Sequence, residues 1–409
     1  TSGGDGIKST NDTDENSGYV TINGGTVSIQ SYSDGIQAEQ AFTMNGGDVT
    51  IETYSGHTFT GSASGGNSGN PWGGGMGGGG MDGNANKTDI SAKGIKAVGL
   101  YSDEAKTTYV SGGDITINGG TLNIDSSDDS LHCAGTMQIL GGDLKLASAD
   151  DGIHSDTDVI IGSESDATNY TSPSVDISYS YEGVEGVTVT MNSGSVMVYS
   201  TDDGFNAAGG ADSSGNSNPG GWGQGGWGGG SSSSSNDYKL TFNGGYTYVN
   251  AAGDGLDSNG DMFINGGYIF VSQTGGGNGP LDCGDNNNSI NYTGGVLVAG
   301  GSSDMFETPS SYSFLTSSSL AAGSTVTFTD SNGTVLATMT FANSSSKMVM
   351  SAPENSVTCY TGGTLSGTTY FPSSTSDANR SVVCGYGGTI SGGTTVSASS
   401  GGGGGGWNW

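Results

Sequence analysis

The sequence predicts an all-β fold: a parallel β-helix of about 22 residues per coil, followed by a small C-terminal β domain. Residues 115–156 carry the main observation, since eleven residues separate the turn residue Asn118 from the corner residue Asp129, and eleven more lead to Leu140 before the next Gly-Gly turn. Polar and apolar residues alternate between these points, as in strands with one buried face. A strand-turn-strand unit that cannot bury its own apolar side and recurs at fixed period indicates a stacked solenoid.

The repeat extends over most of the chain. We expect the β-helix to occupy residues 1–310, with Gly- and Trp-rich loop insertions at 56–88, 160–178 and 209–236. The period ends after Pro309, and a Ser-Asn-Gly turn at 331–333 predicts a hairpin. Residues 311–398 are therefore expected to form a small β cap domain, and 399–409 a Gly-rich tail that ends Trp-Asn-Trp. All five tryptophans fall in Gly-rich segments, outside the expected core.

Charge and cysteine content narrow the class of protein. Forty acidic against nine basic residues give a net charge of −31, which argues against nucleic-acid binding and is typical of a chain that binds cations. The four cysteines form no Cys-x-x-Cys pair, and together with the low lysine content they favour an extracellular or cell-surface location. No apolar run is long enough for a transmembrane segment. Cys359 and Cys384 are candidates for a disulfide or for free thiols.

Stacked coils bring equivalent acidic corners about 4.8 Å apart. The first corner position holds Asp34, Lys93, Asp129, Asp151, Glu182, Asp203 and Asp254, and three residues further on stand Gln37, Lys96, His132, His154, Glu185, Asn206 and Asp257. Two carboxylates at this spacing repel by about 1 kcal/mol in water and about 3–4 kcal/mol at an effective dielectric constant of 20. Protons, lysines or divalent cations must therefore compensate the column.

Calcium suits such a column, because it takes six to eight oxygen ligands from carboxylates, carbonyls and water. The predicted ligands are Asp128, Asp129, Asp150, Asp151, Glu182, Glu185, Asp202, Asp203, Asp254 and Asp257. The alternative is that these residues only favour turns and face solvent. His132 and His154 are interpreted as hydrogen-bonded corner residues rather than transition-metal ligands, because no third soft ligand accompanies them.

The ordered motifs SAKGIKA, SDDSLH, ADDGIH, SYEGVEG, DDGFNAAGG, GDGLDSNG and GNGPLD carry a family resemblance. They resemble the bacterial carbohydrate-binding parallel β-helix family that is known from cellulolytic clostridia and is similar in fold to pectate lyases. The resemblance covers about residues 90–310. It implies a right-handed β-helix with bound calcium that binds cellulose-like or acidic plant cell-wall polysaccharides, without established lyase activity.

A group of aromatic residues is the candidate carbohydrate-binding surface. Aligning the Asn-Gly-Gly turns places Tyr246, Tyr248, Tyr268 and Phe270 on the outward side of two neighbouring coils. Sugar rings stack on such flat aromatic platforms, and contiguous exposed apolar area marks interaction sites. The alternative is that the C-terminal domain or a Gly-rich loop covers this patch.

Three functions follow as hypotheses. The first is a non-catalytic, calcium-binding protein that binds polysaccharide. The second is a pectate-type polysaccharide lyase, in which Lys96 beside calcium removes the proton next to a uronate carboxylate; a lysine that only compensates neighbouring carboxylates is the alternative. The third is a structural subunit that self-associates into extracellular filaments, because uncapped strand edges recruit other chains.

Overall fold

The protein is all-β over the residues that can be described. The computed structural model describes residues 1–11, 16–59, 91–101, 109–208, 238–284, 288–354, 356–371 and 383–399. Within these ranges there is no α-helix, and the helical segments are the short 3-10 turns η1 (Gly56–Thr58) and η2 (Glu164–Asp166). None of the described helices is long and apolar enough to span a bilayer.

The chain divides into two compact units. Unit 1 comprises Thr1–Ile161, Ser172–Val189 and Asn206–Asp237, and unit 2 comprises Gly162–Thr171, Thr190–Phe205 and Tyr238–Trp409. Strands β19 (Thr188–Met191) and β21 (Phe205–Ala207) contain the divisions between these segments. The boundary predicted at residue 310 is a different division, and it stays a prediction.

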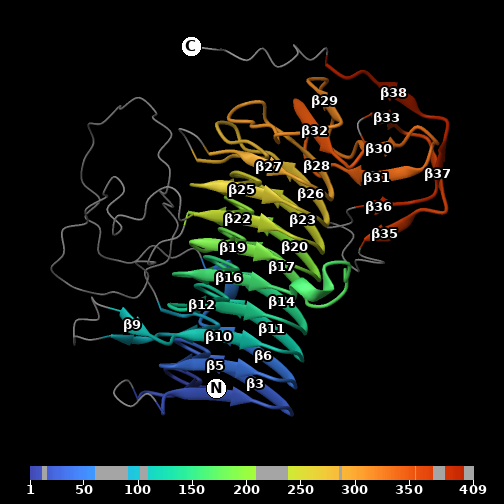
Figure 1. Cartoon of the computed structure of the whole chain (residues 1–409). Coiled ribbons are helices and arrows are strands. Elements are labelled where there is room, and N and C mark those ends of the chain that lie inside the picture. The colour runs from blue at the N-terminus through green and yellow to red at the C-terminus, as the bar shows by residue number, and fades with distance from the viewer. Residues whose placement is uncertain are drawn as a thin grey trace, which may run out of the picture. The chain divides into compact units, whose positions relative to one another are not determined.

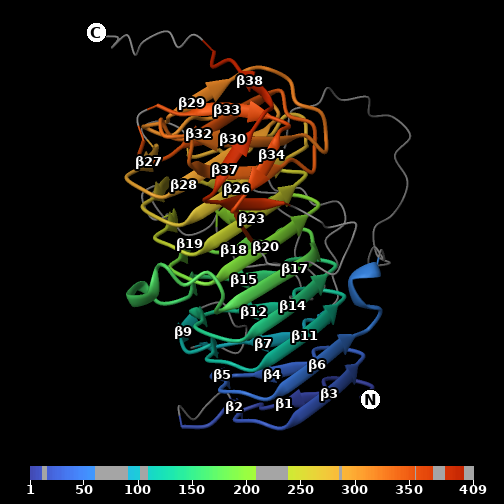
Figure 2. The ribbon, with the colours of Figure 1, turned by 90° about the vertical axis from the view of Figure 1, so that its right-hand side faces the viewer.

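In unit 1 the chain visits three parallel sheets in turn. The first contains β1 (Ile7–Lys8), β4 (Ile36–Ala38), β7 (Ile95–Ala97), β12 (Leu131–Cys133), β15 (Ile153–Ser155) and β18 (Val184–Glu185). The second contains β2 (Tyr19–Ile22), β5 (Ala41–Met44), β10 (Asp114–Ile117), β13 (Met137–Ile139) and β16 (Asp158–Ile161). The third contains β3 (Thr26–Ser31), β6 (Asp48–Thr53), β11 (Thr121–Ser126), β14 (Asp143–Ser148) and β17 (Ser174–Ser180), which lie side by side in Figures 1 and 2.

The register of these sheets confirms the 22-residue period. Leu122 on β11 pairs with Leu144 on β14, and Leu131 on β12 pairs with Ile153 on β15. The glycine that ends each Asn-Gly-Gly turn has a positive φ, 89° at Gly25 and 99° at Gly120, which glycine adopts without steric cost. The all-β class and its long parallel sheets are thus as predicted, and they are compatible with a β-helix.

Two features of the fold differ from the sequence prediction. The insertion expected at 160–178 spans only 162–173, because β16 continues to Ile161 and β17 already begins at Ser174, where Val175 and Ile177 are buried in the sheet. A short antiparallel pair, β8 (Leu100–Tyr101) with β9 (Tyr109–Ser111), was not foreseen. Of the other insertions, residues 60–88 and 209–236 lie outside the described residues, as do all five tryptophans and the tail from residue 400.

Unit 2 combines parallel and antiparallel sheets. Its parallel strands are β20 (Ser195–Ser200), β23 (Tyr246–Ala251), β26 (Tyr268–Gln273) and β28 (Val296–Gly301) in one sheet, β22 (Lys239–Phe242), β25 (Asp261–Ile264) and β27 (Ile290–Tyr292) in another, and β24 (Leu256–Ser258). The sheet that ends in β28 continues with two antiparallel strands, β32 (Lys347–Ser351) and β29 (Phe314–Thr316). The segment after residue 310 therefore adds antiparallel strands to a sheet whose preceding strands are parallel.

The remaining strands of unit 2 form antiparallel sheets. One has the order β35 (Thr369–Phe371), β36 (Cys384–Tyr386), β31 (Val335–Thr340), β30 (Thr325–Thr329), β33 (Thr358–Thr361) and β38 (Thr394–Val396), and β34 (Thr364–Ser366) pairs with β37 (Thr389–Ser391). The pairing of β30 with β31 confirms the hairpin at Ser331-Asn332-Gly333. Cys359 on β33 and Cys384 on β36 are both free thiols. Strands β31 and β30 lie between β33 and β36 in the sheet, which keeps the two cysteines apart.

Candidate functional site

The predicted corner columns exist in unit 1. Gln37 pairs with Lys96, Lys96 with His132, and His132 with His154 on successive strands of the first sheet. Backbone bonds join the corners themselves, because the N–H of Gly94 donates to the Asp129 carbonyl and that of Ser130 to the Asp151 carbonyl, each at 2.9 Å. Side chains at equivalent positions therefore lie one strand spacing apart, as the repeat predicted.

Lys93 supplies a positive charge to the first pair of stacked aspartates. Its side chain is fully buried, and Nζ lies 3.0 Å from Oδ1 of Asp128 and 2.6 Å from Oδ2 of Asp129. Burial alone raises the pKa of Asp129, but the Lys93 ammonium and the hydrogen bond from His132 outweigh it and hold that pKa well below its ordinary value. Lysine compensation, one of the three ways of balancing the column, is thus present at this corner.

Two histidines form the next part of the column. The His132 and His154 rings are stacked, with centroids 4.8 Å apart and planes inclined by 12°. Nδ1 of His132 lies 2.8 Å from Asp129, and Nδ1 of His154 lies 3.1 Å from Asp151 and 2.7 Å from Glu185. Both are hydrogen-bonded corner residues, as predicted.

The two rings differ in protonation. Burial lowers the pKa of His154, but the Glu185 charge and the hydrogen bonds to Asp151, Asp156 and Glu185 raise it well above its ordinary value. Burial and the Lys93 charge lower the pKa of His132. The environment therefore favours the imidazolium at His154 and the neutral ring at His132.

Two groups of ligand-type atoms in unit 1 are close enough to share a metal ion. They are Asp128 with Asp129 and Asp150, and Asp151 with His154 and Glu185, with the atoms of each group within 4.8 Å of one another. The first group already holds the Lys93 ammonium and the second contains the His154 imidazolium, which a metal ion would have to displace. Glu182, beside them, accepts a hydrogen bond of 3.0 Å from Nδ2 of Asn206. Both groups of unit 1 are therefore a poor match for calcium.

The predicted ligands of unit 2 have a different environment. Burial and the carboxylates of Asp257, Asp254 and Asp202 raise the pKa of Asp203 well above its ordinary value. Burial, with the carboxylates of Asp282 and Asp202, raises the pKa of Asp254 to about 7 although the Gly279 N–H donates to it. Burial is the largest cause of both shifts, and the neighbouring carboxylates add to it.

The backbone of unit 2 allows two carboxylates to converge. A Cβ on Gly253 would lie closer than van der Waals contact to Oδ1 of both Asp202 and Asp203, so these two oxygens converge on this glycine. The Asp254 N–H donates to Oδ1 of Asp203 at 2.5 Å and orients it. Carboxylate oxygens are the donors that calcium prefers, but among the described residues no three ligand atoms of this cluster lie within 4.8 Å of one another, as they do in the two groups of unit 1.

Lys96 lies on β7 in the second corner column. Its Nζ donates to Oγ of Ser91 at 3.4 Å, and its neighbours in register are Gln37 and His132. This lysine therefore belongs to the hydrogen-bonded corner row of unit 1.

The predicted aromatic patch is not an exposed platform, and this prediction is corrected. Tyr246, Tyr248 and Phe270 are fully buried, and Tyr268 is half-buried. Phe371 on β35 stacks on Tyr246 with ring centroids 4.7 Å apart, and Tyr386 on β36 stacks on Tyr268 at the same distance. C-terminal strands cover the patch, which was the alternative that the sequence left open, and the four residues belong to the core of unit 2 and its edge.

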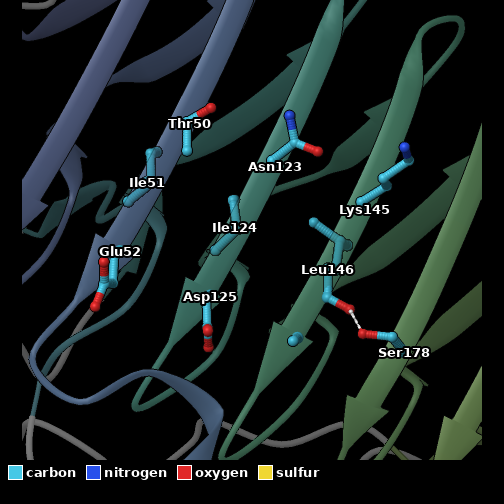
Figure 3. A pocket seen from close by; sticks show the side chains of 10 residues that line it. Thr50, Ile51, Glu52, Asn123, Ile124, Asp125, Lys145, Leu146 and Ser178 are labelled. Atoms are coloured by element: carbon cyan, nitrogen blue, oxygen red, sulfur yellow. Dashed lines mark hydrogen bonds between the residues drawn. The ribbon is translucent and has the colours of Figure 1, made fainter.

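A pocket of about 290 Å³ lies instead on the third sheet of unit 1. Its polar lining is Thr50, Glu52, Asn123, Asp125, Lys145 and Ser178, on four neighbouring strands. Figure 3 shows Thr50, Asn123 and Lys145 in one row across the strands, and Glu52 with Asp125 in a second row. The pairing of Asn123 with Thr50 and with Lys145 fixes this arrangement.

A short turn is bound to Asp125, one of the residues that line this pocket. In η1 the His57 N–H donates to Oδ1 of Asp125 at 2.6 Å, and Nδ1 of His57 lies 2.8 Å from the same oxygen. A Cβ on Gly56 would overlap the Asp125 carboxylate, so the turn requires glycine there. The His57 ring lies 5.3 Å from that of Tyr179, which is 42% exposed. A histidine and a tyrosine thus stand beside the polar floor.

The sequence signal for this site was the polar phase of the strands, which was interpreted only as solvent-facing. Tyr179 reaches the outer face because the register shifts between Leu146 and Ala147, so that Ala147 pairs with Tyr179. His57 arrives from a segment that the repeat does not include. Neither position follows from the 22-residue period.

Comparison with known proteins gives the family. The family model described as carbohydrate-binding domain-containing protein matches residues 1–152 and 135–217, which together are more than half of the 409 residues. The chain therefore belongs to this family of carbohydrate-binding domain-containing proteins. No curated protein and no solved structure matches the chain significantly.

Proposed function

We propose that the protein is an extracellular or cell-surface, non-catalytic polysaccharide-binding protein. The observation that carries this proposal is the pocket on the third sheet, with polar side chains along its strands and Tyr179 and His57 nearby, within the stretch that the carbohydrate-binding family matches. Binding sites for small polar ligands combine a hollow with a few placed hydrogen-bonding groups. We also infer that the parallel sheets belong to a right-handed β-helix, which presents such a row of strands to a long chain.

Calcium is part of this proposal, and its site is in unit 2. The residues that would hold it are Asp202, Asp203, Asp254 and Asp257, supported by their oxygen donors, the raised pKa of Asp203 and the convergence of the Asp202 and Asp203 carboxylates on Gly253. Bound calcium would neutralise the crowded carboxylates and, on an acidic protein, bridge to an acidic glycan. In unit 1, Lys93 and His154 take the compensating role.

A binding assay with metal control tests the function. The full chain is titrated with neutral oligosaccharides and with polygalacturonate, first with calcium and then with EDTA, by isothermal titration calorimetry. We expect binding of glycan, and we expect EDTA to abolish any binding of polygalacturonate. Failure to bind every glycan would refute the function, whereas polygalacturonate binding that EDTA leaves unchanged would refute only the calcium bridge.

The non-catalytic assignment is tested separately. Lys96 donates to Ser91 in the corner row of the first sheet, whereas the pocket lies on the third sheet. We expect no release of unsaturated sugar from polygalacturonate, followed by ultraviolet absorbance with calcium present. Product that disappears in Lys96→Met would establish a lyase instead. Filament assembly stays a prediction from the sequence.

A further inference from the structure

We propose that the pocket on the third sheet binds an uncharged glycan segment that runs across the strands and that it excludes uronic-acid chains; this rests on the proposed function. The residues of this pocket were not predicted as a sugar site from the sequence. The negative charge around the pocket should favour neutral polysaccharides over acidic ones.

The shape favours a ligand that crosses the strands. Thr50, Asn123 and Lys145 are in register on β6, β11 and β14, and Glu52 with Asp125 are in register on the first two of these. Neighbouring strands lie about 4.8 Å apart, so equivalent side chains repeat at about that distance. A linear glycan laid across the strands meets one row position after another.

The second row offers aromatic surface beside the pocket. Ala147, a small residue that lines the pocket, follows Asp125 in that row and pairs with Tyr179 on β17. The His57 ring reaches from Asp125 toward Tyr179, with the two ring centroids 5.3 Å apart, and both rings offer apolar faces. The C–H face of a sugar ring packs on aromatic surfaces of this kind, which combine an apolar body with a polar tip.

The hydrogen-bonding groups suit hydroxyl pairs. Among the described residues, Asn123 and Lys145 make no side-chain hydrogen bond to the protein, so their donors are open to a ligand. Glu52 accepts only from Nε2 of Gln30, at 3.1 Å, and Asp125 uses Oδ1 for His57. The floor thus offers donors in one row and carboxylate acceptors in the next, and vicinal hydroxyls can satisfy both.

The charge of the face excludes acidic sugars. Outward positions of β6, β11, β14 and β17 carry five carboxylates, Asp48, Glu52, Asp125, Asp143 and Asp176, against the single ammonium of Lys145. A uronate in the pocket would place another negative charge beside Glu52 and Asp125. A neutral glycan meets no such repulsion.

Calorimetry in EDTA tests the inference with defined probes: cellohexaose, xylohexaose and mannohexaose against hexagalacturonate. We expect at least one neutral probe to bind about tenfold or more tighter than hexagalacturonate. Ala147→Leu should narrow the pocket that Ala147 lines and weaken the binding of neutral probes by about tenfold or more, whereas Thr26→Leu, exposed on the same sheet outside the pocket, should bind like the unaltered protein. Circular dichroism confirms that both variants are folded.

Three results would overturn the inference, and they are distinguishable. Equal binding of hexagalacturonate in EDTA, lost in Ala147→Leu, would keep the pocket and refute the selectivity. Unchanged neutral binding by Ala147→Leu would place the sugar site elsewhere while the proposed function survives. Absence of binding to every probe would refute the function itself. Glu52→Gln gives a further check. Removing this negative charge should reduce the ratio of the affinity for neutral probes to the affinity for hexagalacturonate.

Discussion

At the scale of single residues, the acidic corners of unit 1 are balanced by the protein's own cations. The sequence established that the column needs compensation but left protons, lysines and divalent ions open. Lys93 fills this role at Asp128 and Asp129, and His154 fills it between Asp151 and Glu185. Whether these side chains or a metal ion balance the carboxylates depends on the directions of the ammonium and imidazole groups. The spacing of residues in the sequence does not predict those directions.

Replacing Lys93 tests this compensation. Lys93→Met leaves Asp128 and Asp129 buried without their ammonium, and removing one partner of a buried pair costs about 3–5 kcal/mol. Lys96→Met is the matched control, because Lys96 is partly exposed and should cost about 1 kcal/mol or less. Urea unfolding of the full chain measures both. Equal stability of the two variants would contradict the role of Lys93.

The raised pKa of His154 predicts a pH dependence. The folded-state pKa lies above the unfolded value of about 6.5, so the stabilisation is fully present below that pH and is lost as pH rises through the folded pKa. The stability advantage of the unaltered protein over His154→Asn should therefore shrink between about pH 6.5 and the alkaline range. Thermal unfolding from pH 6 to pH 10 measures it, and a difference that stays constant would contradict the imidazolium.

At the scale of elements, the turns between the second and third sheets carry an asparagine ladder. Nδ2 of Asn45 donates to Oδ1 of Asn23, and Nδ2 of Asn118 donates to Oδ1 of Asn45, both at 2.8 Å. The next coil of unit 1 has Leu140 at the equivalent position, with 41% of its surface exposed. The ladder therefore stops where the side chain changes, although the Gly-Gly turn continues.

Extending the ladder should stabilise unit 1. In Leu140→Asn the new amide can donate to Oδ1 of Asn118, and one such hydrogen bond contributes about 0.5–1 kcal/mol. Leu140→Ser is the matched control, since it also removes the exposed leucine but is too short to reach Asn118. The melting temperature should rise in the first variant above that of the second. The same melting temperature in both would show that the ladder adds nothing here.

The strands and turns also show which parts of the fold could be predicted from the sequence. The Asn-Gly-Gly turns and the alternation predicted the parallel sheets and their register, because the turn needs glycine at positive φ and the strands need one buried face. The aromatic patch on β23 and β26 was placed correctly on the outer phase, yet Tyr246 is buried by Phe371, more than a hundred residues away in the chain. Periodicity within a strand cannot show what a distant segment covers.

At the scale of the whole molecule, the dominant property is a net charge of −31. Forty acidic residues against nine basic ones cannot be balanced within the protein, and at Asp203 burial together with neighbouring carboxylates raises the pKa. Screening by simple salt weakens repulsion between exposed charges over about 10 Å at 0.1 M but acts less on buried ones. A specific divalent site and general screening therefore predict different responses to added ions.

Calcium should stabilise the chain beyond the effect of ionic strength. At a concentration of one hundred times the dissociation constant, a ligand that binds only the folded state adds about 2.7 kcal/mol, so the melting temperature in calcium should exceed that in sodium chloride of equal ionic strength. Asp254→Asn should abolish this difference and, by relieving repulsion at Asp203, raise the melting temperature in EDTA. Asp143→Asn, at an exposed position of unit 1, should retain the calcium response. Scanning calorimetry with metal analysis measures the response to calcium in the unaltered protein and in both variants. A calcium response that survives in Asp254→Asn would place the bound ion elsewhere.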